Sequence, residues 1–334
     1  MGALNQFAGS TCLVTGGLGF IGSNMANSLA AAGAHVRVLD ALIEQHGGDV
    51  RNIDPSLKEI TVVQGNIADD EVVGPILGGV DFVFNIAGQV SHHESMVDPL
   101  RDTDINVTSQ LKFLEMIRQN RSSAVVVHTS TRQVYGTAQY LPVDEQHPTV
   151  PRDINGVNKL AGENYHRLYG TVHGVRTVSI RLSNVFGPGQ SLQKPGLGFL
   201  PVFIARALRG EPIEVFGDGV QQRDCLYVSD VVDALGKAAQ QVANGSINAG
   251  EVFNVGHTEV LSLLEIAEIV VSRASQGSTI SCIPWPEELA RIDIGGFSGD
   301  YAKAHRLLNW TPQVAFADGI EQTLDFYRRY SWYL

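Results

Sequence analysis

A glycine-rich stretch near the start of the sequence carries the clearest chemical pattern in the chain. Gly16, Gly19 and Gly22 separate a short apolar run from a helical pattern that ends at Gly33. Glycines so spaced let the backbone approach a pyrophosphate, and the N-terminus of the next helix offers it free N–H groups. Asp40 ends the next apolar run, where its carboxylate can bind ribose hydroxyls. The stretch therefore predicts a dinucleotide site, and because Asp40 repels a 2′-phosphate, NAD is favoured over NADP.

Four other apolar runs are each followed by a small or polar residue. These residues are Asn66, Gly88, Thr131 and Asn184. In an open parallel sheet, ligands bind beyond the carboxyl ends of the strands. If the runs are strands of one such sheet, a single cleft gathers these residues around the glycine-rich turn.

Apolar runs and helical patterns alternate along the first half of the chain. Strands are expected at 12–14, 36–39, 60–63, 81–84, 124–127 and 176–182, and helices at 103–119 and 156–169. This alternation predicts an α/β fold with a doubly wound parallel sheet, which is Rossmann-like. We predict an NAD-binding domain over 1–186 and a smaller mixed C-terminal substrate-binding lobe over 187–334. Residues from about 225–258 are expected to return to the main sheet, and a loop at 195–198 could close over a ligand.

Composition limits the class of protein. The 334 residues exceed what one small core needs, and the net charge of -11 argues against nucleic acid and membranes as partners. Cys12, Cys225 and Cys282 show neither disulfide nor metal-binding spacing, so we expect no metal and a reducing, cytoplasmic location. We find no signal-peptide pattern and no apolar run of about 18 residues, so no membrane span is expected.

Several longer motifs occur in a characteristic order. They are TGGLGFIG at 15–22, FNIAG at 84–88, STRQVYG at 130–136, NKLAGENY at 158–165, RLSNVFGPG at 181–189 and FGDGVQQRDCLYVSDVVDA at 216–234. Together they resemble the extended short-chain dehydrogenase/reductases, in particular the NAD-dependent nucleotide-sugar epimerases and dehydratases. The resemblance places a set of residues against NAD, namely Gly16, Gly19, Phe20, Ile21, Gly22, Asp40, Asn66, Ile67, Ala87, Gly88 and Lys159.

The resemblance also implies a reaction. In that family a tyrosine takes a proton from a sugar hydroxyl while hydride passes to NAD, a lysine four residues later holds the nicotinamide ribose, and a serine or threonine binds the hydroxyl. Lys159 and Thr131 match the last two, but Asn155 occupies the position of the tyrosine. An asparagine amide can orient a substrate but cannot take a proton.

Two routes for the proton remain open. Thr131 could relay it through a water held by Lys159. Alternatively, His92 or His93 could accept it, because imidazoles titrate in the suitable range. Both histidines could equally be solvated loop residues.

The residues after Thr131 separate the branches of the family. The dehydratases carry Asp-Glu there, whereas this chain carries Arg132 and Gln133. Arginine stays protonated and glutamine does not titrate, so a 4,6-dehydratase is disfavoured. Arg132 could bind an anionic group such as a sugar carboxylate, or it could pair with Asp144 or Glu145.

The substrate side is also assigned by resemblance. Asn184 and Arg223 match the residues that bind the nucleotide diphosphate, and Arg291 lies near a second arginine of the family. Guanidinium groups suit phosphate because their donors form a fixed fork. Arg223 could instead form an ion pair with Asp224 or Asp230.

We therefore expect an NAD-dependent epimerase acting on a nucleoside-diphosphate sugar through a transient keto intermediate. One alternative is a sugar-nucleotide oxidoreductase or decarboxylase with altered proton chemistry. Another, which Asn155 favours, is a catalytically weak NAD-binding protein. The resemblance also implies a homodimer formed through the helices at 103–119 and 156–170.

Overall fold

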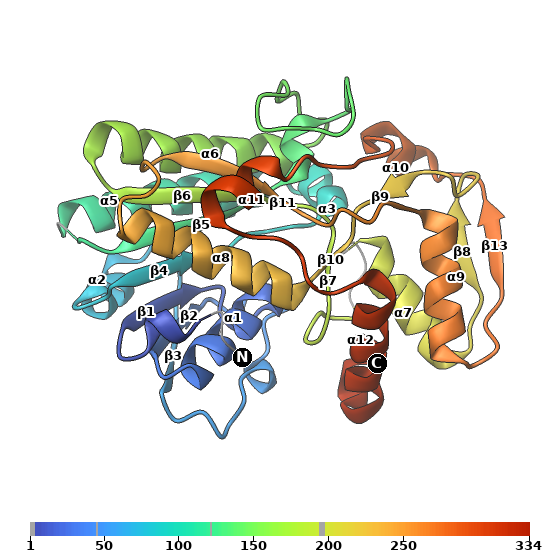
Figure 1. Ribbon diagram of the computed structural model, residues 1–334, viewed down its shortest axis with the longest axis horizontal. Helices are drawn as coiled ribbons and strands as arrows, with labels where there is room; N and C mark the ends of the chain where they lie inside the picture. Colours follow the sequence, from blue (N-terminus) through green and yellow to red (C-terminus); the bar gives the residue numbers. More distant parts are fainter. Residues whose placement is uncertain (1–3, 45, 121, 194–197) are drawn as a thin grey trace.

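The computed structural model of the protein describes residues 4–44, 46–120, 122–193 and 198–334. Residues 195–197 of the predicted closing loop lie outside the described residues. A seven-stranded sheet in the order β11-β6-β5-β4-β1-β2-β3 forms the centre, and every strand pair in it is parallel (Figure 1). The strands are β1 (Thr11–Thr15), β2 (His35–Asp40), β3 (Ile60–Gln64), β4 (Phe82–Asn85), β5 (Val125–Thr131), β6 (Arg176–Leu182) and β11 (Glu251–Val255).

Both faces of this sheet are covered by helices. Successive side chains of a strand point to opposite faces, so Cys12 and Val14 of β1 pack into one core and Leu13 into the other. Helices α1 (Phe20–Ala31), α8 (Val228–Ala243) and α11 (Ala302–Leu308) cover the first face. Helices α2 (Asp70–Leu77), α5 (Ser109–Gln119) and α6 (Ile154–His173) cover the second. The predicted Rossmann-like α/β fold is confirmed.

Two helices differ from their predicted bounds. The helix expected at 103–119 consists of α4 (Pro99–Thr103), a π-helical turn (Asp104–Thr108) and α5. Helix α6 starts two residues earlier than expected because Asp153 caps it, with its Oδ1 accepting a hydrogen bond of 2.6 Å from the N–H of Gly156. Such π-helical turns are frequent at functional sites, and this one carries Asn106 beside the pocket described below.

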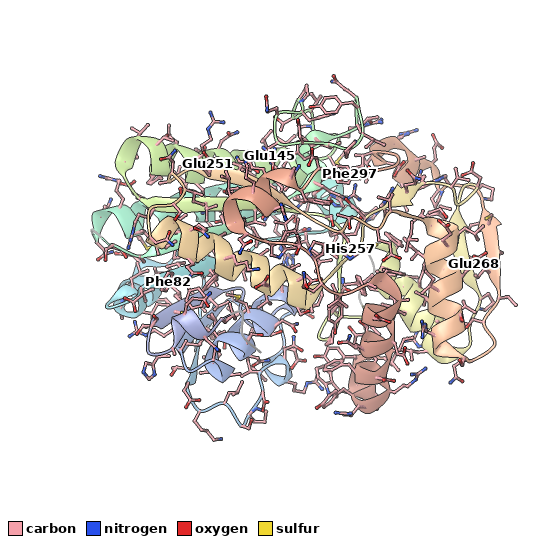
Figure 2. The ribbon with its side chains drawn as sticks, in the orientation of Figure 1. Phe82, Glu145, Glu251, His257, Glu268 and Phe297 are labelled. Atoms are coloured by element: carbon pink, nitrogen blue, oxygen red, sulfur yellow. The ribbon has the colours of Figure 1, made fainter. Side chains whose placement is uncertain are left out.

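The C-terminal lobe has a core of its own. Helices α7 (Phe199–Arg209), α9 (Leu263–Ala274) and α12 (Phe316–Arg329) pack with the parallel pair β8 (Ile213–Phe216) and β13 (Ile280–Ile283). Of the later segments, β11 pairs with β6 as an edge strand of the main sheet and α8 packs on the sheet face. The shorter elements are α3 (His92–Val97), α10 (Glu287–Ile292), β7 (Val185–Phe186), β9 (Gln222–Arg223), β10 (Leu226–Tyr227) and β12 (Leu261–Ser262). Phe297 (Figure 2) lies at the junction of the lobes, because it packs against Tyr135 and its N–H bonds to the carbonyl oxygen of Gln222 on β9.

Two further expectations, that no helix spans a membrane and that the protein forms a homodimer, concern the surface of the molecule. None of the described helices has the length and apolar content that crossing a bilayer needs. Helix α6 exposes Val157, Leu168 and Val172. The homodimer through this helix stays a prediction.

Candidate active site

A pocket of about 680 Å³ opens beyond the carboxyl ends of the central strands. It lies where β1 and β4 are neighbours and the strand order reverses, which is where open α/β sheets bind ligands. The predicted site residues that line it are Gly16, Gly19, Phe20, Ile21, Gly22, Asp40, Asn66, Ile67, Ala87, Gly88, Thr131, Arg132, Asn155, Lys159, Asn184 and Arg223.

The glycine-rich turn is shaped for close packing and for an anion. Gly16 has φ +65°, and a Cβ on Gly22 would lie 2.1 Å from the carbonyl oxygen of Gly16. Helix α1 begins after Gly19 with no side-chain cap and no acid in its first turn. Its first N–H groups and its positive dipole end are therefore free for a pyrophosphate, so the turn fits the predicted dinucleotide.

Asp40 is held at the edge of the pocket by the turn. Its Oδ2 accepts from the N–H of Leu18 at 3.0 Å, and its Oδ1 accepts from that of Leu42 at 2.8 Å. The remaining lone pairs suit ribose hydroxyls. Arg37 donates instead to two backbone carbonyl oxygens at the end of α2, at 2.8 and 2.7 Å, so it offers no partner for a 2′-phosphate.

Replacing Asp40 by alanine is expected to raise the Kd for NAD about 10-fold or more, because a charged hydrogen-bond acceptor is lost. Calorimetric titration of the purified variant measures this change. Asp325→Ala is the control, because Asp325 pairs with Arg328 on the exposed face of α12. An unchanged Kd for Asp40→Ala would contradict the placement of the ribose at this carboxylate.

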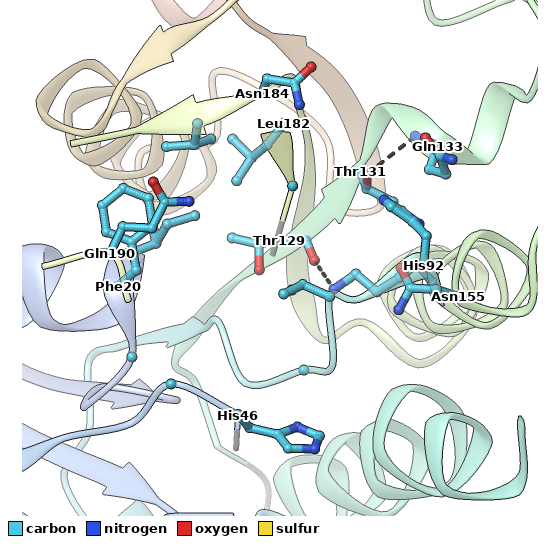
Figure 3. A pocket seen from close by; sticks show the side chains of 18 of the residues that line it. Phe20, His46, His92, Thr129, Thr131, Gln133, Asn155, Leu182, Asn184 and Gln190 are labelled. Carbon is cyan, nitrogen blue, oxygen red and sulfur yellow. Dashed lines mark hydrogen bonds between the residues drawn. The ribbon is translucent and has the colours of Figure 1, made fainter. Parts of the chain in front are cut away.

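Lys159 and Thr131 both line the pocket, from α6 and β5. Lys159 is buried, and its Nζ donates to the carbonyl oxygen of Thr129 at 2.7 Å (Figure 3). Burial lowers the pKa of Lys159 to about 8, against the charges of Asp102 and Glu163. A Cβ on residue 88 would lie 2.9 Å from Oδ1 of Asn106 and 3.3 Å from this Nζ, so a larger residue there would crowd both side chains.

Asn155 is fixed by hydrogen bonds at the position of the missing tyrosine. Its Nδ2 donates to the carbonyl oxygen of Gln89 at 2.8 Å and to Oδ2 of Asp102 at 3.0 Å. Asp102 is buried and also accepts from the side chains of Asn106 and Asn158. Both amide hydrogens of Asn155 are thus used, and the side chain has no proton to exchange.

His92 has a neighbour that the sequence analysis did not identify. Its Nδ1 lies 3.2 Å from Oδ2 of the buried Asp153, which is an ion-pair distance without hydrogen-bond geometry, so this buried Nδ1 has no hydrogen-bond partner among the described residues. Oδ2 of Asp153 accepts from Nε2 of Gln133 at 2.9 Å. Burial raises the pKa of Asp153, but the contacts with His92, Gly156 and Gln133 outweigh it, and the net shift is downward. The position of Asp153 directly before a helix predicts a cap but not this contact.

The two predicted histidines differ in their surroundings. His92 lies with Thr131 and Asn155 on one side of the pocket (Figure 3). His93 also lines the pocket, but its Nε2 is 3.9 Å from the exposed Glu288. Of the two, only His92 is paired with a buried acid.

Unpaired polar atoms mark the substrate side of the pocket. Asn184 Oδ1 and Arg223 Nε are both buried and have no hydrogen-bond partner among the described residues. The hydroxyl of Ser130 is in the same condition, and its position beside Thr131 at the end of a strand is the signal that could have identified it. Buried polar atoms of this kind are usually satisfied by a ligand or water.

The arginines occupy different environments. Arg223 forms no ion pair with Asp224 or Asp230, and the acid nearest to it is Asp293, 3.9 Å away. Arg291 lies on the exposed face of α10, pairs with Glu287 and does not line the pocket. The structure therefore does not bring Arg291 together with the other predicted residues.

Arg132 does not form the ion pairs considered above. Asp144 accepts from the hydroxyl of Tyr140 at 2.8 Å, and Glu145 accepts from the N–H of Asn254 at 2.7 Å. Neither acid has a described contact with Arg132, whose Nη1 is buried and unpaired within the described chain.

A doubly wound sheet with a glycine-rich turn at its switch point, and with a Thr–Lys pair across the pocket, defines an NAD-binding short-chain dehydrogenase/reductase. Comparison with known proteins narrows the class. The chain belongs to the NAD-dependent epimerase/dehydratase family, whose model matches residues 12–256. NAD is therefore the cofactor that the glycine-rich turn serves.

Epimerases and dehydratases both resemble the chain over most of its length. The UDP-glucose 4-epimerase of Mycolicibacterium smegmatis is 32% identical over 96% of this chain and 99% of its own length. The dTDP-glucose 4,6-dehydratase of Streptomyces niveus is 30% identical over 95% of this chain and 92% of its own. The structure of an epimerase from Methanothermobacter thermautotrophicus matches with a TM-score of 0.90 and 29% identity, covering 100% of this chain and 96% of that one. These relatives are enzymes, and both epimerases and dehydratases are among them.

Proposed function

We propose that the protein is an epimerase that inverts a carbinol centre of a nucleoside-diphosphate sugar through a transient keto intermediate. The observation that carries this proposal is Arg132-Gln133 directly after Thr131 in the pocket. Neither side chain can serve as the acid or base of a water elimination. Bound NAD supplies a hydride acceptor, and its return of the hydride to the other face of the sugar requires no further cofactor.

The substrate is held at two ends. Arg223 Nε is a buried donor with no partner among the described residues, which supports a role for this side chain in binding the diphosphate end. Asn184 lines the same pocket and could donate to the diphosphate from its amide nitrogen. Thr131 and Lys159 face the reacting end from β5 and α6. The cleft between them lets the sugar reach the nicotinamide end of the cofactor site.

His92 takes the role of the absent tyrosine. Its Nδ1 lies at ion-pair distance from Asp153, which orients the ring, and Nε2 is left to accept the proton of the sugar hydroxyl. Asp153 is a positioning residue, held by the N-terminus of α6 and by Gln133. Asn155 orients the loop at Gln89 and exchanges no proton.

A panel of UDP-, dTDP-, GDP- and CDP-sugars tests the proposal. We expect an epimer product and only transient absorbance of reduced nicotinamide near ~340 nm, because the oxidised cofactor is restored in each turnover. Continuous release of reduced cofactor would instead identify a net oxidoreductase or decarboxylase. Tight NAD binding without turnover on any sugar would identify a catalytically weak NAD-binding protein.

A further inference from the structure

Arg132 is the charged residue of the pocket that the mechanism leaves unused. It follows Thr131 at the end of β5 and opens the short 3₁₀ turn Arg132–Tyr135. Its Nη1 is buried and has no hydrogen-bond partner in the described part of the chain. Leaving a buried donor unbonded is costly, so this atom marks the place of an acceptor that a ligand provides.

The surroundings of Arg132 fix its guanidinium without neutralising it. Its guanidinium carbon lies 5.1 Å from the ring centre of Phe297, which is buried at the junction of the lobes. Asp224 is the nearby acid, and its Oδ2 accepts from the hydroxyl of Tyr301 and, at 2.8 Å, from the N–H of Gly299. Its Oδ1 is buried and has no hydrogen-bond partner among the described residues, so it does not bond to Arg132 either. Among the described residues, no ion pair joins Arg132 to an acid.

The charge balance around Arg132 favours an anion. Burial and the charge of Arg223 lower the pKa of Arg132 to about 10, and the nearby Asp224 offsets only part of this. Burial also raises the pKa of Asp224 to about 6, so this carboxylate is itself a costly counter-charge. An anion bound at the Arg132 guanidinium would stabilise its charged form.

Arg132 and Arg223 reach the pocket from different elements, although their charges interact. Arg132 is the next residue after Thr131, which faces the reacting end of the cofactor site. Arg223 lies on β9, where its Nη1 is held by the carbonyl oxygens of Gln222 and Gly295, both at 2.8 Å. A second anion, carried by the sugar itself, would therefore lie in the part of the pocket that Thr131 and Arg132 line together.

We propose that the substrate is a nucleoside-diphosphate sugar that carries a carboxylate, such as a nucleoside-diphosphate uronic acid, and that Arg132 binds this carboxylate. The guanidinium would donate parallel hydrogen bonds to the two carboxylate oxygens. The inference rests on the proposed function, because it requires a sugar nucleotide in this pocket.

Matched ligand pairs test this inference by binding alone. UDP-glucose with UDP-glucuronate, and dTDP-glucose with dTDP-glucuronate, differ only in the group at C6 of the sugar. Titration calorimetry on the NAD-loaded protein is expected to show about 10–100-fold tighter binding of the glucuronate in the pair with the preferred base. In Arg132→Met, this preference should fall to about one-fold, with little change for the neutral sugar.

Two variants and two contrary outcomes complete the test. Arg132→Lys keeps the positive charge, so it should keep part of the preference for the glucuronate. This variant provides the test if Arg132→Met fails to fold. Arg273→Met is the control, because Arg273 pairs with Glu321 on the surface. Equal affinity for both members of a pair, or equal losses for both in Arg132→Met, would overturn the carboxylate assignment while leaving the proposed function intact. Binding of no member of the UDP-, dTDP-, GDP- and CDP-sugar panel would contradict the proposed function itself.

Discussion

Replacing His92 by glutamine is expected to lower kcat for epimerisation by about 10²–10⁴-fold. Glutamine is similar in size but has no nitrogen that titrates, so it cannot accept the hydroxyl proton. The Kd for NAD should stay within about 2-fold of the wild-type value, because the glycine-rich turn and Asp40 lie at the other end of the pocket. Product analysis and calorimetric titration measure the two quantities separately.

The controls for His92 separate proton transfer from structure. His93→Gln changes the neighbouring imidazole, which faces the exposed Glu288, and should leave kcat nearly unchanged. Added imidazole should partly restore kcat to His92→Ala, which a purely structural role does not explain. Wild-type kcat in His92→Gln would contradict the assignment and direct attention to a water relay through Thr131.

The sequence was sufficient to predict the sheet and the cofactor end of the site. Each strand of the main sheet is an apolar run with a turn after it, so β1 to β6 and β11 can be located from pattern alone. The turn at 16–22 and Asp40 are joined by a single helix and strand, so the number of residues between them determines that they lie side by side. The hydrogen bond from the N–H of Leu18 to Oδ2 of Asp40 shows that they do. For this end of the pocket, residue types and intervals carry most of the information.

The reacting end could be predicted only in part, because it depends on packing between distant elements. His92 meets Asp153 because α3 packs against the start of α6, and no local pattern encodes that contact. Arg132 looks from sequence as if it could pair with Asp144 or Glu145, yet both acids are bonded elsewhere. Which charge is left unpaired is a property of the folded chain.

Arg291 was assigned to the substrate from its position relative to the family's motifs, and the structure places it outside the pocket. The helix that carries it, α10, has no buried residue, and the Arg291 side chain pairs with Glu287 within the same helix. The number of residues that separate Arg291 from the other motifs does not determine whether its side chain faces the pocket or the solvent, because loop segments vary in length. A role for Arg291 in phosphate binding therefore stays a prediction.

Replacing Lys159 by methionine is expected to lower kcat by about 10²–10³-fold without destabilising the fold. The loss follows because the buried ammonium group beside Gly88 no longer holds the ribose or stabilises charge at the reacting end. Stability is expected to hold because burial lowers the pKa of this lysine from 10.5 to about 8. Charging it at pH 7 therefore costs the folded state about 3 kcal/mol, which methionine avoids.

The same pKa predicts the pH dependence of the wild-type enzyme. Lys159 is protonated below its pKa, so activity should fall as the pH rises through about 8. Between about 8 and 10.5 the unfolded chain binds more protons than the folded one at this group, so its contribution to stability rises with pH over that window. An alkaline loss of activity is therefore not a sign of unfolding at Lys159, and circular dichroism at each pH checks this.

A surface lysine provides the matched control for Lys159→Met. Lys237 pairs with Asp233 on α8 at 2.9 Å, so Lys237→Met removes the same charge away from the pocket and should leave kcat and its pH profile unchanged. Wild-type activity in Lys159→Met would show that the N-terminal half of α6 does not belong to the catalytic site. A large fall in melting temperature would instead show that Asp102 and Glu163 need the lysine charge more than burial opposes it, since both carboxylates raise its pKa.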